Sequence, residues 1–537
     1  MKILIVVPRF KETNKTTYDY VFPLGLGYVS SALKKAGHKV NCLNLNHYNR
    51  TMEELINNEL DKNDYDFICT GGMTFAYSFI KQIIDTVKKH SSKVKIIVGG
   101  LIVTSEPETM FDMLNPDFAV VGEGEETICE LLDCINKQDD SYKVKGLLFR
   151  DEKGDIIFTG KRESVQDLDS LPYPDFEGLG FENYLNNLYC NSLPNAAHNS
   201  FDHPRTYPIL GSRGCPFNCT FCYHYDKYRK RSLESIKQEL HKMVKQYRIN
   251  RIIFFDECLA LDKNRLWAIC KIIKELRKEI SWELKWSPQL TVLGVDDEIL
   301  HELRDSGADT VSYGFESMSP VVLKSMNKPI TPEMISSVFH KTLKAGLGVV
   351  GNFIFGDIAE TKETAQTTIN WWRSDSKGQM NLLFIQPYPG SKIYEHCLQK
   401  GIIKDKIDFI ENRMRTTNWY NMTDGMSDKE LERLKNMVIV LNLKHRYFTK
   451  PISIKKTGEN IYEIKVKCPF CKNVLVYKNL FMEKKRKWLY SMPLVCRECH
   501  LTFFVVSFVR RIIYRSPDFV LLKLADLYFY LRRRHVF

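Results

Sequence analysis

Short apolar runs alternate with amphipathic stretches over the first 140 residues. The runs are KILIVV, HKVNCLNL, DFICTGG, KVKIIVGG and DFAVVGEGE, and residues 24–37, 75–90 and 125–136 between them have helical periodicity. Short apolar runs separated by helices indicate βα units and a parallel sheet. We therefore expect an α/β fold that begins with a Rossmann-like, doubly wound parallel sheet over residues 1–140.

Three of these strands end in glycine-rich turns. The turns are Gly71-Gly72, Gly99-Gly100 and Gly122-Glu123-Gly124. Ligands of open α/β sheets bind at the carboxyl ends of the strands, and glycine allows a backbone to approach a ligand closely. The turns fit a ligand site, and they equally fit tight βα connections.

A second alternating region follows a linker module over residues 141–204, in which GLLFRDEKGDIIFTG predicts a hairpin. Strand-like runs recur as YPILG, RIIFFDE, ELKWS, ADTVSYG, LGVVGNFIFG and MNLLFIQPY, with helical stretches between them. About six βα units predict a full or partial β/α barrel over residues 205–415, with its active site at the strand C-terminal ends. Residues 416–460 are expected to form a helical connector, and residues 461–537 a small C-terminal module.

Composition narrows the class of protein. The chain has 537 residues, a net charge of +12 and 15 cysteines. The basic residues are spread along the chain, so we expect a solvated basic surface and no nucleic-acid partner. The cysteines are too sparse for a disulfide scaffold. We find no secretory signal and no apolar run of spanning length, and we expect a cytoplasmic protein.

The most informative segment is GSRGCPFNCTFCYH, which follows the first barrel strand. It carries Cys215, Cys219 and Cys222 in a C-x3-C-x2-C pattern. Three thiolates on a four-iron cluster leave one iron open to bind another molecule, which suits an enzyme. The alternative is a zinc site completed by His224.

This segment resembles the signature of the radical SAM superfamily. The three cysteines match it residue by residue, and Phe221 matches the aromatic residue before the last cysteine. The resemblance implies a [4Fe-4S] cluster whose open iron binds S-adenosylmethionine (SAM). One electron then cleaves SAM and releases a 5′-deoxyadenosyl radical.

Downstream segments resemble the SAM-binding blocks of the same superfamily. RIIFFDE places Asp256 and Glu257 at the SAM ammonium group, although Asp256 equally fits a helix N-cap. YGFESMSPVVLKSMNK implies ribose contacts from Glu316 and Ser317, and NFIFGDIAET implies that Gly356 lies near the adenine. Gln289 stands where the family leads us to look for an arginine.

The N-terminal region resembles the cobalamin-binding domain that precedes many radical SAM barrels. FPLGLGYVSSALKKAGHKV, IIVGGLIVTSEPE and AVVGEGEETICELL carry this resemblance. It implies that the three glycine turns contact cobalamin. The motif Asp-x-His-x-x-Gly is absent, so no histidine is supplied as lower ligand, and Ile102 stands where the subgroup often has histidine. The two resemblances together cover residues 1–415.

These resemblances imply a cobalamin-dependent radical SAM enzyme. We expect it to methylate an unactivated carbon of a small-molecule, natural-product or lipid substrate, with an external one-electron reductant of the flavodoxin or ferredoxin type. An alternative is cyclisation or rearrangement by the same machinery without methyl transfer. An alternative from another class is an Fe–S or zinc binding or electron-transfer module without radical chemistry.

The tail contains two further thiol pairs and a basic end. KCPFC and VCREC place Cys468, Cys471, Cys496 and Cys499 in two C-x2-C pairs, the spacing of a structural zinc ribbon, with a second Fe–S cluster as the alternative. The final segment, SPDFVLLKLADLYFYLRRRHVF, is apolar and then basic. It fits a peripheral membrane contact, or a helix packed on the body of the protein.

Overall fold

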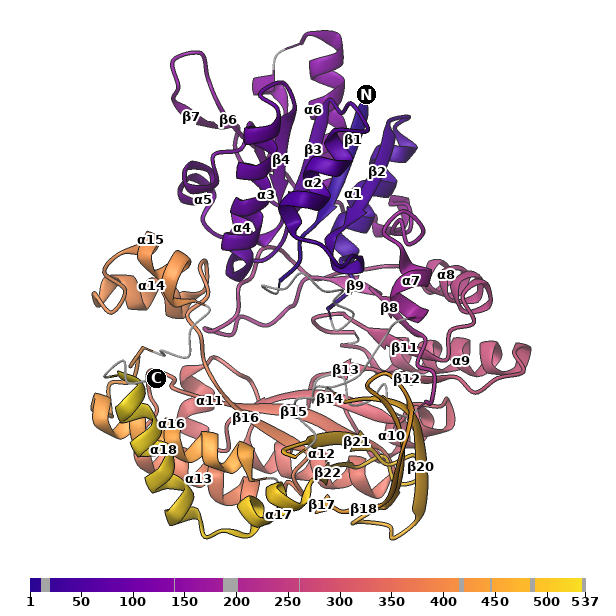
Figure 1. The fold of residues 1–537 in the computed structure, drawn as a ribbon, viewed down its shortest axis with the longest axis vertical. Coiled ribbons are helices and arrows are strands. Elements are labelled where there is room, and N and C mark those ends of the chain that lie inside the picture. Colours follow the sequence, from indigo (N-terminus) through magenta and orange to yellow (C-terminus); the bar gives the residue numbers. More distant parts are fainter. Residues whose placement is uncertain are drawn as a thin grey trace.

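The computed structural model describes residues 1–10, 20–139, 141–186, 201–259, 261–414, 420–444, 447–482 and 488–533. Figure 1 shows the N-terminal sheet at one end of the molecule, a barrel of strands and helices beneath it, and the C-terminal strands and helices around the far end of the barrel.

The N-terminal sheet has seven strands in the order β2-β1-β3-β4-β5-β6-β7. The first five pair in parallel, as the alternation of apolar runs predicts: β1 (Lys2–Val7), β2 (Lys39–Asn44), β3 (Phe67–Gly71), β4 (Lys95–Gly99) and β5 (Phe118–Val120). The predicted hairpin forms as β6 (Leu147–Arg150) and β7 (Ile156–Phe158), and it extends this sheet antiparallel to β5.

Helices cover both faces of this sheet because alternate strand residues are apolar on both sides. One core joins Ile3 and Ile5 to α1 (Leu24–Lys35) and α6 (Glu125–Lys137). The other core lies beneath four helices: α2 (Met52–Leu60), α3 (Tyr77–His90), α4 (Leu101–Thr104) and α5 (Pro107–Leu114). The doubly wound sheet expected from the sequence is therefore confirmed.

The second region is a six-unit partial barrel built from two parallel sheets. Their orders are β12-β11-β8 and β13-β14-β15-β16. The strands are β8 (Thr206–Ile209), β11 (Arg251–Phe254), β12 (Lys285–Ser287), β13 (Gln289–Leu290), β14 (Thr310–Glu316), β15 (Gly348–Phe355) and β16 (Met380–Phe384). The predicted barrel is thus confirmed in its partial form.

The outer helices of the barrel follow their strands in turn. They are α8 (Leu233–Gln246), α9 (Lys263–Glu279), α10 (Asp297–Asp305), α11 (Pro320–Ser325), α12 (Pro332–Lys344) and α13 (Lys362–Ser374). Local chemistry sets their starts. Thr331 caps α12 by accepting a hydrogen bond from the Met334 amide, and Pro332 takes the first helical position.

The chain returns to the N-terminal region after the last barrel strand. Helix α14 (Lys392–Gln399) contributes Ile393, Tyr394 and Cys397 to the core beneath α3 and α5, and the short helix α15 (Lys406–Asp408) follows it. Figure 1 shows both helices beside the N-terminal sheet, away from the barrel helices. The barrel and the N-terminal region are therefore connected by packing as well as by the linker.

Only part of the expected connector is helical. Helix α16 (Asp428–Leu443) forms, whereas β17 (Phe448–Thr449) and β18 (Pro451–Gly458) are strands. The expectation of helix over residues 448–458 is therefore wrong. Strand β17 pairs with the distant β22, and β18 forms a hairpin with β19 but is exposed along nearly all its length, so neither strand has a marked apolar alternation.

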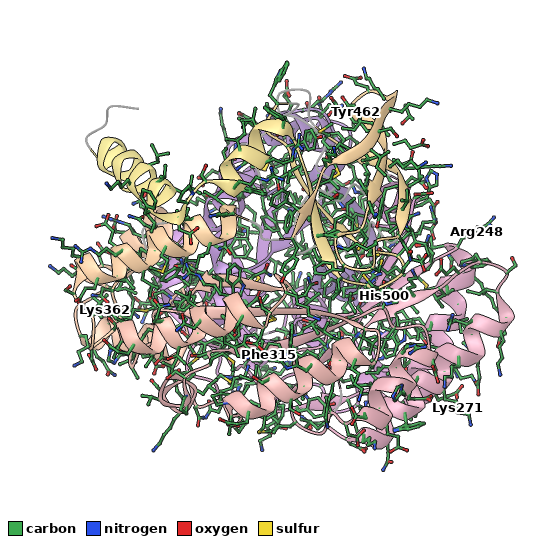
Figure 2. The ribbon with its side chains drawn as sticks, turned by 90° about the horizontal axis from the view of Figure 1, so that it is seen from below. Arg248, Lys271, Phe315, Lys362, Tyr462 and His500 are labelled. Carbon is green, nitrogen blue, oxygen red and sulfur yellow. The ribbon has the colours of Figure 1, made fainter. Side chains whose placement is uncertain are left out.

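The C-terminal module consists of two small sheets around the tail cysteines. Its orders are β17-β22-β21 and β18-β19-β20, with β19 (Ile461–Lys467), β20 (Val474–Phe481), β21 (Ser491–Val495) and β22 (Thr502–Val506). Helices α17 (Phe508–Arg515) and α18 (Asp518–Arg533) follow. Figure 2, seen from below, shows His500 where these strands meet the barrel, and its ring contacts the Gly346 carbonyl at 2.8 Å.

The last helix packs on the body of the protein at its start. Asp518 accepts from Arg373 at 3.2 Å and from Lys444 at 2.6 Å, which fixes α18 against α13 and α16. Among the described residues no helix combines the length and the apolarity needed to cross a membrane.

Candidate active site

The three clustered cysteines lie in a loop held by a short hairpin. Its stems are β9 (Ser212–Arg213) and β10 (Arg229–Lys230), which pair antiparallel. Gly214 begins the loop with φ of 78°, and a Cβ there would lie 2.6 Å from the Lys227 carbonyl oxygen. Only glycine fits this turn.

The sulfur atoms of all three cysteines face one cavity of about 460 Å³. Burial raises the pKa of each thiol, that of Cys222 to about 12. A bound cationic centre would therefore have to displace protons before these cysteines ligate as thiolates. Phe221 also lines the cavity.

The cavity lies at the C-terminal ends of the barrel strands and is closed from above by the N-terminal domain. Barrel residues around it include Glu257, Cys258, Gln289, Leu290, Thr291, Gly314, Glu316, Lys328, Pro329, Ile330 and Tyr388, and the opposite wall consists of Met73, Thr74, Phe75, Leu101 and Ser105. The site predicted from barrel topology is therefore shared between two regions of the chain.

The two acidic residues after β11 have different positions. Glu257 lines the cavity, and burial raises its pKa. Asp256 is almost fully buried; it accepts from the Gly211 amide at 2.9 Å and from the Ser212 hydroxyl, and burial raises its pKa to about 6. The Asp256 carboxylate thus holds the start of the cysteine loop, while Glu257 faces the cavity.

Glu316 and Lys328 form an ion pair in the cavity wall. Lys328 Nζ lies 2.7 Å from Glu316 Oε1. Glu316 adopts φ of 66°, a strained conformation for a residue with a side chain, at an irregularity in the pairing of β14 with β15. At Gly314 a Cβ would lie 2.6 Å from Lys328 Nζ, so glycine there leaves room for the pair.

Ser317 and Gly356 lie outside the cavity lining. The Ser317 hydroxyl is buried, accepts from the Ser319 amide and lies 3.3 Å from the Thr368 hydroxyl. Gly356 has φ of 93°, which favours glycine whatever lies nearby. Ser317 directly follows β14 and Gly356 directly follows β15, so both lie at strand ends without lining the cavity.

Two of the glycine turns pack on each other. A Cβ on Gly71 would lie 2.2 Å from the Gly99 carbonyl oxygen, and one on Gly100 would lie 2.9 Å from the Gly72 carbonyl oxygen. This contact brings the next residues, Met73 and Leu101, to the cavity wall. Ile102 is fully buried in the core.

The third turn faces the cysteine loop. A Cβ on Gly122 would lie 1.9 Å from Tyr225 Oη, and Glu123 forms ion pairs with Arg213 and Arg229. Gly124 precedes the first residue of α6 as its N-cap. These contacts connect the N-terminal sheet directly to the stems of the cysteine loop.

Comparison with protein families decides the class. The family model described as "Radical SAM superfamily" matches residues 209–371, and the one described as "B12 binding domain" matches residues 13–132. The chain therefore contains a radical SAM domain and a B12-binding domain. Its barrel carries the radical SAM match, and its N-terminal sheet carries the B12-binding match.

Similar proteins include enzymes of two reaction types. An uncharacterised methyltransferase of Pyrococcus horikoshii is 27% identical over 469 residues, which cover 86% of this chain and 95% of the relative. The anaerobic magnesium-protoporphyrin IX monomethyl ester cyclase of Cereibacter sphaeroides is 24% identical over 471 residues, which cover 84% of this chain and 71% of the relative.

A solved structure shares the fold of this radical SAM enzyme. The radical SAM methyltransferase TsrM from Kitasatospora setae aligns with a TM-score of 0.60 at 17% identity, covering 75% of this chain and 77% of that chain. The two family matches imply three cofactors: a [4Fe-4S] cluster, SAM and cobalamin. The arrangement of thiols, acids and glycine turns around one cavity fits these groups.

The spacing of the thiols separates the two cysteine sites. Cys468, Cys471, Cys496 and Cys499 have sulfur atoms within 4.8 Å of one another, with 3.8 Å from Cys468 to Cys499 and 3.6 Å from Cys471 to Cys496. Four thiolates this close fit one tetrahedral zinc ion, with Zn–S bonds of about 2.3 Å. Among the described residues this is the only such group, and no three ligand atoms of the loop cysteines and His224 lie this close together.

Several cavity residues were not singled out from the sequence. Lys328 lies in a quoted segment, but only the fold brings it to Glu316. Met73 and Leu101 directly follow glycine turns, which is a usable sequence signal. Cys258 and Tyr388 gave no signal of their own.

Proposed function

We propose that this protein is a cobalamin-dependent radical SAM methyltransferase that methylates an unactivated carbon of a small-molecule, natural-product or lipid substrate. One observation carries the proposal. The cavity that holds the three loop cysteines is closed by residues that directly follow the glycine turns of the B12-binding region. Cluster, SAM, cobalamin and substrate would therefore meet in one enclosed space.

In this proposal Cys215, Cys219 and Cys222 ligate the [4Fe-4S] cluster, and Phe221 packs beside it. When bound, the cofactors supply a 5′-deoxyadenosyl radical that abstracts a substrate hydrogen atom and a methyl group for the resulting carbon radical. The protein's part is to hold these groups in register and to keep water away from the radical.

The charged residues of the cavity match the charges of SAM. Glu257 would accept the SAM ammonium group, and Lys328 would pair with its carboxylate, because each faces the cavity with the opposite charge. Glu316 would hold the ribose hydroxyls from its fixed position beside Lys328. Asp256, Ser317 and Gly356 would act by supporting these positions.

Cobalamin would lie against the turns Gly71-Gly72 and Gly99-Gly100, above Met73 and Leu101. The third turn, at residues 122–124, does not line the cavity and packs on the cysteine loop. The four tail thiols would hold a zinc ion with a structural role, because a site closed by four thiolates leaves no position for a substrate.

The domain division that supports this function has five parts. We propose a cobalamin-binding domain over residues 1–140, a linker module over 141–204, the radical SAM barrel over 205–415, a connector over 416–460 and the zinc-ribbon-like module with the basic tail over 461–537. The last strands of the connector, β17 and β18, join the two sheets of the zinc-ribbon-like module. The second candidate reaction is cyclisation without methyl transfer. It is supported by the similarity to a cyclase of comparable coverage.

The experiment uses anaerobically reconstituted protein with full cluster content. The proposal predicts that reduction in the presence of SAM yields 5′-deoxyadenosine, and that methyl transfer adds S-adenosylhomocysteine. Cys219→Ala should abolish both products, while Cys134→Ser, a change outside the cavity, should keep them. A fully loaded protein that forms no 5′-deoxyadenosine contradicts radical chemistry. Formation of 5′-deoxyadenosine without S-adenosylhomocysteine would favour the cyclisation candidate.

Two partners complete the proposal. Radical SAM enzymes act on small molecules with an external reductant. We infer a cytoplasmic one-electron donor of the flavodoxin or ferredoxin type.

The C-terminal helices present a surface suited to an anionic membrane. Phe508 and Ile512 on α17 are 68% and 56% exposed, and Trp488 in the turn before β21 is 81% exposed. Arg510 Nε donates to the Leu489 carbonyl at 3.0 Å, which places that turn beside α17. The sequence has no acidic residue from 500 to 517 and has three arginines there. Exposed apolar side chains among arginines fit the interface of an anionic bilayer.

Vesicle co-sedimentation tests this contact. Binding is expected with phosphatidylglycerol-containing vesicles, weaker binding with phosphatidylcholine alone, and loss of binding for Phe508→Ser/Ile512→Ser. Val474→Ser, which removes an exposed apolar side chain from β20, is the matched control. Equal sedimentation of all variants, or none by the wild type, would contradict the contact.

A further inference from the structure

The third glycine turn carries a carboxylate that is already engaged by two arginines. Glu123 Oε1 lies 2.8 Å from Arg213 Nη1 and 3.0 Å from Arg229 Nη2, and Oε2 lies 2.9 Å from Arg229 Nη1. The Val165 amide donates to Oε2 at 2.8 Å. All acceptor positions of the carboxylate therefore face protein groups.

The two arginines occupy the two stems of the cysteine loop. Arg213 is in β9 and Arg229 is in β10, and these residues are paired directly across the hairpin. Arg213 also contacts Glu125 at the start of α6, at 2.6 Å, and stacks over Tyr28 of α1. One carboxylate of the B12-binding region thus holds both ends of the loop that carries Cys215, Cys219 and Cys222.

The far side of the loop is anchored to the same region. The Tyr223 hydroxyl donates to the Thr104 carbonyl at 3.1 Å, and the Thr104 hydroxyl accepts from the Gly122 amide at 2.9 Å. Tyr225 packs so closely on Gly122 that no Cβ fits there. The cysteine loop therefore contacts the B12-binding region through Tyr223 and Tyr225 as well as through its two stems.

Burial restricts the movement of the three side chains that make these contacts. The side chains of Glu123, Arg213 and Arg229 are 13%, 16% and 9% exposed. Charge pairs of this kind are weakly screened. Without Glu123 each arginine would keep one carboxylate partner, Glu125 at 2.6 Å from Arg213 and Asp226 at 3.2 Å from Arg229, but the link that joins the two stems would be lost. The geometry is also bidentate from Arg229, which restricts orientation as well as distance.

We propose that Glu123 is a positioning residue that ties the cluster loop to the cobalamin-binding sheet and so sets the separation of the two cofactors. We call Glu123, Arg213 and Arg229 the Glu123 clamp. This inference rests on the proposed function, since it requires a cluster on the loop and cobalamin on the sheet. It assigns Glu123 a role other than contact with cobalamin.

The test is the magnetic coupling between the two cofactors in reconstituted holoprotein. A reduced cluster accelerates the relaxation of a nearby cob(II)alamin spin, and this effect falls steeply with distance. It is measured as the change in EPR saturation of cob(II)alamin when the cluster is reduced. The clamp predicts a strong enhancement in the wild type and a severalfold smaller or more dispersed one in Glu123→Gln, at unchanged iron and cobalamin content.

Controls separate positioning from cofactor binding. Glu126→Gln makes the same change in a half-exposed residue of α6 that pairs with Arg162 at the surface, and should behave as wild type. Arg229→Gln releases one stem only and should lose part of the enhancement; it also serves if Glu123→Gln fails to fold. Full cofactor content with unchanged enhancement in both clamp variants overturns the inference. Loss of cobalamin from Glu123→Gln with an intact cluster also overturns it, in favour of direct contact.

A different result marks failure of the proposed function. If wild-type protein retains no cobalamin or assembles no cluster, the cofactor assignment itself is wrong. The role proposed for the Glu123 clamp is then wrong as well. That result is visible before any variant is compared.

Discussion

At the scale of single residues, the chemistry of the site depends on a few charged side chains whose positions are set by the local backbone conformation. Lys328 and Glu316 are held together in the cavity wall, with the strained φ of Glu316 and the open space at Gly314 both serving the pair. Glu316 ends β14, whereas Lys328 lies in the loop between α11 and α12, so the fold brings the two residues together.

Replacement of Lys328 by methionine should weaken SAM binding by roughly tenfold or more, since a hydrogen bond to a charged group contributes about 1.5–3 kcal/mol. Equilibrium binding of SAM to the reconstituted protein checks this, with iron content measured alongside. Lys324→Met on the exposed face of α11 is the control. Unchanged affinity at full cluster content would rule out the contact with SAM.

Glu360 should make stability depend on pH. It is buried behind the loop after β15; burial raises its pKa to about 7, and the Asp357 carboxylate adds to this. The folded state therefore holds a proton that the unfolded state releases above its ordinary pKa near 4.5. This contribution to stability is present below pH 4.5 and is lost as the pH rises through 7.

Glu360→Gln removes that titration. At pH 8 the variant should melt at a higher temperature than the wild type, and its free energy of unfolding should be higher by about 3 kcal/mol. The two proteins should be equally stable near pH 4.5. Glu363→Gln, on the exposed first turn of α13, should leave the wild-type profile in place. Parallel profiles for Glu360→Gln and wild type would refute the assignment.

At the scale of elements, the two sheets of the barrel are joined by a buried ion pair. Arg251 of β11 contacts Asp309, just before β14, at 2.7 and 2.9 Å, and both side chains are almost fully buried. Burial alone would raise the pKa of Asp309, but Arg251 holds it at about 2. The pair spans the gap between the two sheets, where backbone pairing is reduced to one bridge between Trp286 and Ala308.

Asp309→Asn should therefore destabilise the barrel by about 3–5 kcal/mol, because it leaves the Arg251 charge buried without its partner. Thermal or chemical unfolding measures the loss. Asp133→Asn breaks an exposed pair with Lys137 on α6 and should cost about 0.5 kcal/mol or less. Similar losses in the two variants would show that the barrel sheets do not depend on this pair.

At the scale of the whole molecule, the C-terminal module is attached to the end of the barrel opposite the cavity. Besides the His500 ring contact, Gln379 exchanges two hydrogen bonds with Thr502, at 2.7 and 3.0 Å, and Arg497 pairs with Asp202 at 2.6 Å. His500 and Thr502 closely follow Cys499 in the chain. A metal on the tail thiols would thus stabilise the surface that covers the barrel.

Removal of that metal should loosen the barrel as well as the module. Cys496→Ser is expected to lose bound zinc and to lower the melting temperature of the whole protein, with iron at the loop cysteines unchanged, since metal binding is coupled to folding of such small modules. Metal analysis and calorimetry check this, with Cys134→Ser as control. Loss of iron and sulfide in place of zinc would identify the tail site as a second Fe–S cluster.

How much could be predicted from the sequence differs between fold and site. The βα units, the barrel and the two thiol sites follow from local patterns: apolar runs, glycine turns and cysteine spacing. Strand β17 escaped prediction because its partner β22 lies more distant in the chain, and β18 because it is exposed along nearly all its length and lacks an apolar alternation. Asp256 and Glu257 are neighbours in sequence, yet only Glu257 lines the cavity, because the Asp256 carboxylate accepts hydrogen bonds from Gly211 and Ser212.

The sequence by itself determined the class of chemistry, because the cysteine loop resembles the radical SAM signature residue by residue and all the matching residues lie in one short segment. It likewise determined the parallel sheets, through the period of its apolar residues. Only the tertiary structure decided which distant residues share the cavity, and that Glu123 faces two arginines of the cysteine loop. Those contacts join segments 90 and 106 residues apart, and no local pattern specifies which side chains will meet across such a distance.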